Sequence, residues 1–178
     1  MARVSRESYL EAALEVLADS GAEGLTIARL CTRLEVTKGS FYHHFGGMPE
    51  LVTALLGFWE DARSNQLIAL SASEPDPRAR AELLTSIAAG LPHAAEAALR
   101  SWGRGNPEVR TAVQRVDQTR EDHIYESMHL AGMPVEQARL LAKTAIAVLV
   151  GTQQRENPVD ARSLQTMLEN LDSTMRER

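Results

Sequence analysis

The chain has 178 residues, of which 44% are hydrophobic, and its formal net charge is −5 at pH 7. This length suits one compact unit or a small module joined to a larger one, and the hydrophobic fraction is enough for a core. The single cysteine, Cys31, excludes an intrachain disulfide, and the acidic residues among the first twenty positions argue against a secretion signal. The longest apolar run, Ala145 to Val150, is too short to cross a membrane, so we expect a cytoplasmic protein.

Capping residues and helical spacing predict three N-terminal helices, over Arg6 to about Ser20, Ile27 to Leu34, and Lys38 to Phe45. Ser5, Thr26 and Thr37 stand at the N-cap positions, where a hydroxyl oxygen can accept a hydrogen bond from the first turn. Gly21 ends the first helix. Because three short helices bury little surface, we expect this module to lean on the helices that follow.

Proline and glycine signals divide the rest of the chain into six further helices: Pro49 to about Leu70, Asp76-Pro77 to about Gly90, Pro92 to about Gly103, Asn106-Pro107 to about Ala131, Val135 to about Arg155, and about Asp160 to Met175. The clearest linker signal is SASEPDP, from Ser71 to Pro77. There is no strand pattern, repeat or low-complexity tract. The sequence therefore predicts an all-α fold of about nine helices.

The third predicted helix has two different sides. Phe41 and Phe45 lie four residues apart, so both face inward. The remaining face carries one cation, a bare backbone, a hydroxyl, a phenol and an imidazole, from Lys38, Gly39, Ser40, Tyr42 and His43. Gly39 costs about 1 kcal/mol of helix propensity, which close approach to another surface would justify. Such a face suits a helix that enters the major groove of DNA.

The run LTIARLCTRLEVTKGSFYHHF, followed by MPELVTALL, resembles the N-terminal DNA-binding domain of TetR/AcrR-type transcriptional regulators. The resemblance covers Ser5 to Leu56, under a third of the chain, and the block Val36 to Phe45 is its most specific part. Two positions depart from the family pattern. Glu35 stands where glycine is usual, so a positive φ there would strain it modestly. The family usually has a phosphate-binding lysine near the position of Met48, and this sequence has none there.

The resemblance implies residues 1–47 as a helix-turn-helix DNA-binding domain and residues 48–178 as a helical ligand-binding and dimerisation domain. On the groove face we expect Lys38, Gly39, Ser40, Tyr42 and His43, and as phosphate contacts Thr26, Thr37 and His44. The first 47 residues hold five Lys/Arg and six Asp/Glu, so DNA affinity depends on local placement of cations and helix N-termini.

The helix Val135–Arg155 carries a single charge, Lys143, between Leu140 and Gln154. A helix without a polar face is buried on both sides, against its own domain and against a partner subunit. The alternative is the central helix of a monomeric bundle. We expect a homodimer whose interface contains Ala142, Ala145, Leu149, Leu164, Leu168 and Leu171.

Bulky apolar residues in the middle of the chain suggest a ligand cavity, because such sites are concave and mostly apolar. Its expected lining is Phe58, Trp59, Leu91, Trp102, Val116, Asp117 and Ile124, although each of these could equally be ordinary core. In TetR-like proteins the middle helices enclose an inducer cavity. A ring-containing apolar or amphipathic compound would suit it, and a cationic one would suit Asp117 and Glu121.

The histidines at positions 93, 123 and 129 lack the spacing of metal ligands, and no nucleophile or phosphate-loop motif is present, so we expect no metal, no cofactor and no enzymatic activity. The sequence is most consistent with a repressor that a small molecule releases from a pseudo-palindromic operator. A ligand-responsive activator and a ligand-independent DNA binder remain alternatives. A protein-interaction module, or an all-α enzyme with a degenerate helix-turn-helix, is a further alternative.

Overall fold

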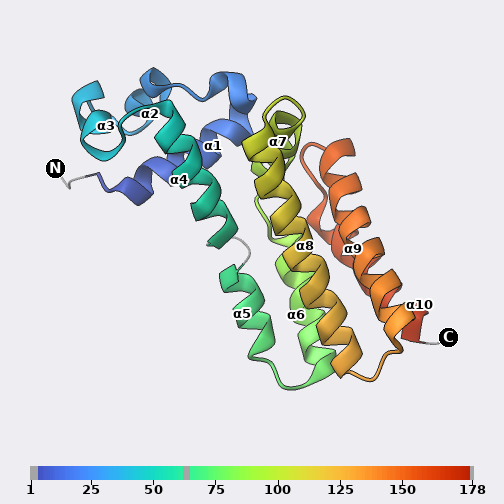
Figure 1. Cartoon of the computed structure of the whole chain (residues 1–178). Coiled ribbons are helices and arrows are strands. Elements are labelled where there is room, and N and C mark those ends of the chain that lie inside the picture. Colours follow the sequence, from blue (N-terminus) through green and yellow to red (C-terminus); the bar gives the residue numbers. More distant parts are fainter. Residues whose placement is uncertain (1–3, 62–64, 177–178) are drawn as a thin grey trace. The chain divides into compact units, whose positions relative to one another are not determined.

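The computed structural model describes residues 4–61 and 65–176 and shows an all-α protein with ten helices in those residues. The helices of the N-terminal part are α1 (Arg6–Gly24), α2 (Ile27–Arg33), α3 (Lys38–His44) and α4 (Met48–Glu60). The others are α5 (Gln66–Ala72), α6 (Pro77–Ala89), α7 (His93–Gly103), α8 (Pro107–Leu130), α9 (Val135–Arg155) and α10 (Ala161–Arg176) (Figure 1). In the described residues no helix is both long and apolar enough to span a bilayer.

The helices divide between two compact units. One contains the residues up to Asp61 together with Ala94–Val113, and the other contains Ala62–His93 and Gln114–Arg178. The first unit thus holds α1 to α4, nearly all of α7 and the beginning of α8. Within it, α1 contacts α2 and α4, and α2 contacts α3. Our boundary at residue 47 followed the helix-turn-helix module and stays a prediction.

The predicted N-caps are confirmed by hydrogen bonds. The hydroxyls of Ser5, Thr26 and Thr37 accept from the backbone N–H three residues onward, at 3.1, 3.2 and 3.4 Å. Asp76 does the same for α6, where its carboxylate accepts from Ala79 N at 2.7 Å. Gly21 adopts φ 63°, so the chain kinks there, but helical hydrogen bonding resumes and α1 runs on to Gly24.

Within the predicted helix from Pro49 to Leu70 the structure describes α4 and α5, and residues 62–64 of that span lie outside the described residues. The apolar periodicity continues through α4 and α5 because each helix packs against a hydrophobic core, α4 in the first unit and α5 in the second. Leu51, Leu55 and Trp59 of α4 are buried in the first unit, whereas α5 packs against α6 in the second. Ser71 and Ala72, expected in the linker, belong to α5.

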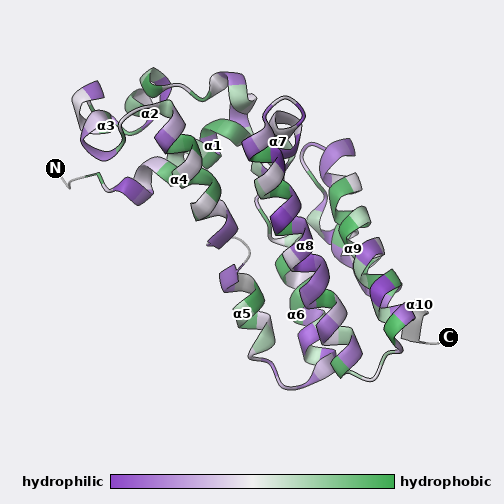
Figure 2. Ribbon diagram, viewed as in Figure 1, coloured by the Kyte–Doolittle hydropathy of each residue, from purple (hydrophilic) through white to green (hydrophobic). Residues whose placement is uncertain are grey.

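The second unit has two groups of buried apolar residues, and α10 packs against both α6 and α9. One group joins α6, α8 and α9 and consists of Ala81, Met128, Met133, Ala138 and Leu141. The other consists of Leu91, Leu149, Leu164 and Leu168. Along α9 hydrophobic and hydrophilic stretches alternate, whereas the visible side of α8 is mostly hydrophilic (Figure 2).

Candidate functional site

The inner side of α3 is fixed by aromatic packing on α1. Phe41 and Phe45 are 0% and 1% exposed, and each meets the ring of Tyr9 edge-on with centroids 5.8 Å apart. The Tyr9 hydroxyl donates to Ser40 Oγ at 3.0 Å, which adds a polar bond between the two helices. Sequence reasoning overlooked Tyr9, although it lies at helical spacing from the buried Ala13 and Leu17.

The outer side of α3 is solvent-exposed, as the sequence predicted. Tyr42 is 57% exposed, and Lys38, Gly39 and His43 are also exposed. A Cβ added to Gly39 would find its nearest neighbour, Thr37 Oγ1, at 3.6 Å, which is ordinary van der Waals contact. The fold itself therefore does not require glycine at position 39. Ser40 differs from expectation, because it is only partly exposed and its oxygen faces Tyr9.

The expected phosphate contacts occupy three different settings. Thr26 and Thr37 are exposed, and each hydroxyl accepts a capping bond while keeping its own proton for a further acceptor. His44 is partly buried, with its ring 5.5 Å from that of Tyr9, and its carbonyl accepts from Arg6 Nη1 at 3.0 Å. The imidazole of His44 is thus part of the aromatic packing as well as a candidate contact.

Arg6 and Glu50 form a clasp that joins the start of α1, the end of α3 and the start of α4. Arg6 Nη2 lies 3.2 Å from Glu50 Oε1, and the guanidinium lies over the Phe45 ring, 4.6 Å from its centroid. The other carboxylate oxygen of Glu50 accepts from Gly46 N at 2.8 Å. This backbone bond, together with Arg6, lowers the pKa of Glu50. The clasp provides a connection between α3 and α4 that the sequence analysis did not identify.

The turn between α2 and α3 has the strain that the sequence suggested. Glu35 adopts φ 53°, in the left-handed region. Beside it, the buried Cys31 thiol donates to Thr37 O at 3.6 Å. Burial raises the pKa of Cys31, although the nearby Lys38 acts in the opposite direction. Cys31 is therefore a packed thiol that stabilises the turn.

The cations of the module are unequally placed. Arg33 faces two carboxylates of α1, with Glu15 at 3.3 Å and Asp19 at 2.8 Å. Its charge therefore ties α2 to α1. Arg29 and Lys38 are exposed, and no described carboxylate forms an ion pair with either.

The predicted pocket residues are divided between the two units. Phe58, Trp59 and Trp102 belong to the first unit, where Trp59 is 1% exposed. Leu91, Val116, Asp117 and Ile124 belong to the second. Leu91 and Ile124 line the pockets described below, and neither tryptophan is among the lining residues of those pockets.

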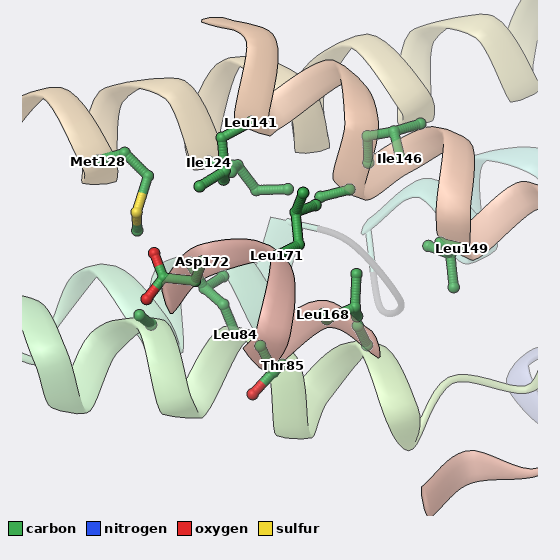
Figure 3. A pocket seen from close by; sticks show the side chains of 13 residues that line it. Leu84, Thr85, Ile124, Met128, Leu141, Ile146, Leu149, Leu168, Leu171 and Asp172 are labelled. Carbon is green, nitrogen blue, oxygen red and sulfur yellow. The ribbon is translucent and has the colours of Figure 1, made fainter. Parts of the chain in front are cut away.

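The second unit contains a small aliphatic pocket of about 70 Å3 between α6, α8, α9 and α10. Leu84, Ile124, Ile146 and Leu171 point into it (Figure 3). A neighbouring pocket, also of about 70 Å3, shares Leu84, Ala88, Ile124, Ile146 and Leu149 with the first and adds Leu91, Arg120 and His123 among others. The two are adjoining spaces in one largely aliphatic interior.

Most of the expected dimer residues lie in the core of their own subunit, and this corrects their assignment. Ala142 and Leu164 are 0% exposed, and Leu149 and Leu168 are 3% and 7% exposed. Ala145 and Leu171 are partly buried and line the aliphatic pocket. The outward sides of α9 and α10 carry other residues, among them Leu140 at 55% and Met167 at 39% exposure.

The three histidines considered as metal ligands have separate local partners. His93 lies with Nε2 3.0 Å from Ala89 O and Nδ1 3.3 Å from Gln153 Nε2. His129 Nδ1 lies 3.3 Å from Met133 O. His123 Nε2 lies 2.7 Å from Ser71 Oγ, and because that hydroxyl donates to Ile68 O, the imidazole must be the donor. These are structural hydrogen bonds of the second unit.

Comparison with known proteins agrees with the geometry of α2 and α3. The family model for bacterial regulatory proteins of the tetR family matches residues 10–55. Over 55 residues the chain is 40% identical to the class D tetracycline repressor and 44% identical to the class C repressor, both of Escherichia coli. The match spans 31% of this chain and about a quarter of the length of those curated relatives, 25% in each case.

Solved structures extend the likeness to the whole fold. A TetR-family regulator from Rhodococcus sp. matches with a TM-score of 0.77 at 19% identity, over 96% of this chain and 98% of that one. A TetR-family regulator from Streptomyces coelicolor matches with a TM-score of 0.75 at 20% identity, over 97% and 94%. A regulator from Saccharomonospora viridis, solved with choline, gives 0.72 at 18% identity, over 93% of each chain. Residues 10–55 of this chain thus match the N-terminal domain of the tetR family of bacterial regulatory proteins, and the chain as a whole shares the fold of solved TetR-family regulators.

Proposed function

We propose that this protein is a homodimeric repressor that reads a pseudo-palindromic operator with α3 and leaves it when a small molecule binds the second unit. The observation that carries the proposal is the contrast between the two sides of α3. Its inner side is held by Tyr9, Phe41 and Phe45, while Lys38, Gly39, Tyr42 and His43 remain exposed. A rigid helix with an exposed, hydrogen-bonding face is what direct readout in the major groove needs.

The assignment of contacts follows from exposure. Tyr42 and His43 are the candidates for base edges, and Gly39 lets the backbone come close to the DNA. The exposed hydroxyls of Thr26 and Thr37, which cap the N-termini of α2 and α3, are our candidates for donors to phosphate oxygens. Ser40 is a weaker candidate than the sequence suggested, because its oxygen already accepts from Tyr9.

The test is operator binding by variants of the exposed face. An operator would first be selected from a random DNA library with the parent protein. Tyr42→Ala and His43→Ala should each weaken binding by about 1–3 kcal/mol if they make good base contacts, with unchanged thermal unfolding. Thr119→Ala, an exposed change on α8, is the matched control. Parent-like affinity in both α3 variants would refute the groove assignment.

The dimer part of the proposal rests on an uncharged exposed stripe. On α9 this stripe consists of the exposed Leu140, Ala147 and Gln154 with the half-buried Thr144 and Gly151 between them, and on α10 of the exposed Ser163, Met167, Asn170 and Thr174. Leu140 and Met167 are exposed hydrophobic residues, and Ala147 and Gly151 are small enough for close helix approach. A partner's copy of the same stripe would cover it symmetrically. Two subunits are also what a pair of half-sites requires.

The ligand part rests on the adjoining apolar pockets of the second unit, because small-molecule sites are concave and mostly apolar. The regulator from Saccharomonospora viridis that shares the fold was solved with choline. A ligand changes operator affinity only if it binds the DNA-competent and DNA-incompetent states unequally. A reporter assay in a strain without the gene would separate repression from activation, because loss of a repressor raises expression and loss of an activator lowers it.

A further inference from the structure

Two imidazole side chains stand next to each other at the end of α3. His43 is exposed and His44 is half-buried, and their ring centroids lie 5.2 Å apart. Both belong to the last turn of the helix, where the carbonyl ends favour a positive charge. Imidazole is the side chain whose charge ordinarily changes between about pH 5 and 8. The imidazole pair, His43 and His44, therefore gives the reading helix groups that can gain a proton near physiological pH.

The charged groups beside His44 cancel each other. Arg6 Nη1 donates to the carbonyl of His44 at 3.0 Å, but Nη2 of the same guanidinium lies 3.2 Å from Glu50 Oε1, so this clasp is neutral overall. The ring of Tyr9, 5.5 Å from that of His44, keeps its proton and donates it to Ser40 Oγ. These neighbours from α1 and α4 therefore leave room for an external charge to decide the protonation of the pair.

Few full positive charges accompany the pair. Arg33 of α2 is held by Glu15 and Asp19, at 3.3 and 2.8 Å. Arg29 of α2 and Lys38 of α3 are exposed and form no ion pair with a described carboxylate. With two such cations on α2 and α3, one further proton on the imidazoles is a large addition to the charge that these helices would present to a phosphate backbone.

We propose that operator binding is coupled to proton uptake by the imidazole pair, so that affinity rises as the pH falls from about 8 to 6. This inference rests on the proposed reading of DNA by α3 and adds a form of regulation to it. Phosphates near the end of α3 stabilise imidazolium, because an opposite charge favours the charged form. The bound state then holds more protons than the free state, and by linkage acid strengthens binding. Since two positive charges 5.2 Å apart repel, we expect about one proton for each pair.

The test is the pH dependence of operator affinity. The operator selected with the parent protein would be titrated by fluorescence anisotropy from about pH 8 to pH 6 at constant ionic strength, above the range in which carboxylates take up protons. We expect the affinity of the parent to rise at least about tenfold over this range. Calorimetry in two buffers of different ionisation enthalpy would count the protons taken up. Constant affinity, weaker binding at lower pH, or no proton uptake would overturn the proposal.

Glutamine variants locate the proton, because glutamine keeps a hydrogen-bonding side chain but does not titrate. The double variant with His43→Gln and His44→Gln should bind the operator with an affinity that does not change with pH. His129→Gln, at an exposed position of the second unit, is the matched control and should keep the pH dependence of the parent. A double variant with parent-like thermal unfolding and parent-like pH dependence contradicts the assignment. The proton count on the parent tests the coupling without any variant.

Tyr42→Ala separates this inference from the broader function. If Tyr42→Ala weakens operator binding while the affinity of the parent is constant with pH, the reading of DNA by α3 stands and the proton coupling fails. If Tyr42→Ala and the double histidine variant both bind the operator like the parent at every pH, α3 is not the reading helix and both proposals fail.

Discussion

If α3 binds in the major groove as we propose, Gly39 serves DNA binding at a cost to the stability of the helix. Its position in α3 is exposed, and an added Cβ would meet nothing closer than 3.6 Å. Helix propensity alone favours alanine there by about 1 kcal/mol. What argues for glycine is the approach of a DNA surface, which a methyl group would hold away.

Gly39→Ala should therefore raise the free energy of unfolding by up to about 1 kcal/mol and weaken operator binding. Urea denaturation and fluorescence anisotropy would measure the two effects. Gly57→Ala is the matched control, because Gly57 is also an exposed helical glycine with nothing within 4 Å of an added Cβ. It should show the same stabilisation with no loss of binding. Stabilisation without weaker binding at position 39 would remove the close-approach argument.

Single residues were well predicted where the local chemistry is decisive. The caps at Thr26, Thr37 and Asp76 follow from hydroxyl or carboxylate oxygens just before a helix. Glu35 was expected to be strained because it replaces the usual glycine of the family pattern, and its φ of 53° confirms this. The bond from Tyr9 to Ser40 joins residues that are distant in sequence, so no local rule could reveal it.

At the scale of helices, the Arg6–Glu50 clasp should make the stability of the DNA-binding module depend on pH. The pKa of Glu50 is lowered below its usual 4.5, chiefly by the bond from Gly46 N. A carboxyl with a depressed folded-state pKa stabilises the fold above its unfolded-state pKa, and this contribution is lost as the pH falls through the folded-state value.

The difference in stability between the parent and Glu50→Gln should accordingly be present near neutral pH and shrink below about pH 4.5, where the parent becomes protonated as well. Urea titrations across this range would measure it. If the free energies of unfolding of the parent and Glu50→Gln differ by the same amount from neutral to strongly acidic pH, the negative charge of Glu50 does not contribute to stability.

The sequence predicted where the helices begin and end more accurately than which side of each helix is buried. The bounds of α9 match the prediction, yet its buried side was assigned wrongly, because one charge between Leu140 and Gln154 leaves no polar face to orient the helix. Burial in the structure separates the two sides: Ala142 and Leu149 face the core, and Leu140 and Ala147 face out. The lining of the predicted pocket was difficult to assign for a related reason: bulky aromatic residues such as Trp59 can fill core space, and the described pocket of the second unit is lined mainly by aliphatic residues.

At the scale of the whole molecule, the exposed uncharged stripe predicts how dimerisation can be broken without unfolding the subunit. Ala147→Glu places a charge on the outer side of α9, where a partner would bury it at a cost of several kcal/mol. Sedimentation should show a shift toward monomer, with circular dichroism unchanged. Ser86→Glu, at an exposed position of α6, is the control.

Leu149 would be a poor site for the same experiment, because it is 3% exposed and a charge there would disrupt the subunit's own core. If the Ala147 variant sediments like the parent, the stripe is not the interface. If the parent itself is monomeric at micromolar concentration, the homodimer is wrong.

The carboxylates that engage Arg6 and Arg33 also affect how the protein would find its operator. With these two guanidinium groups held by Glu50, Glu15 and Asp19, few positive charges in α1–α3 remain to displace counterions from the phosphate backbone. Loose binding to arbitrary sequence should then be brief. We expect a search dominated by short visits and three-dimensional diffusion, with long residence reserved for sites whose groove fits α3.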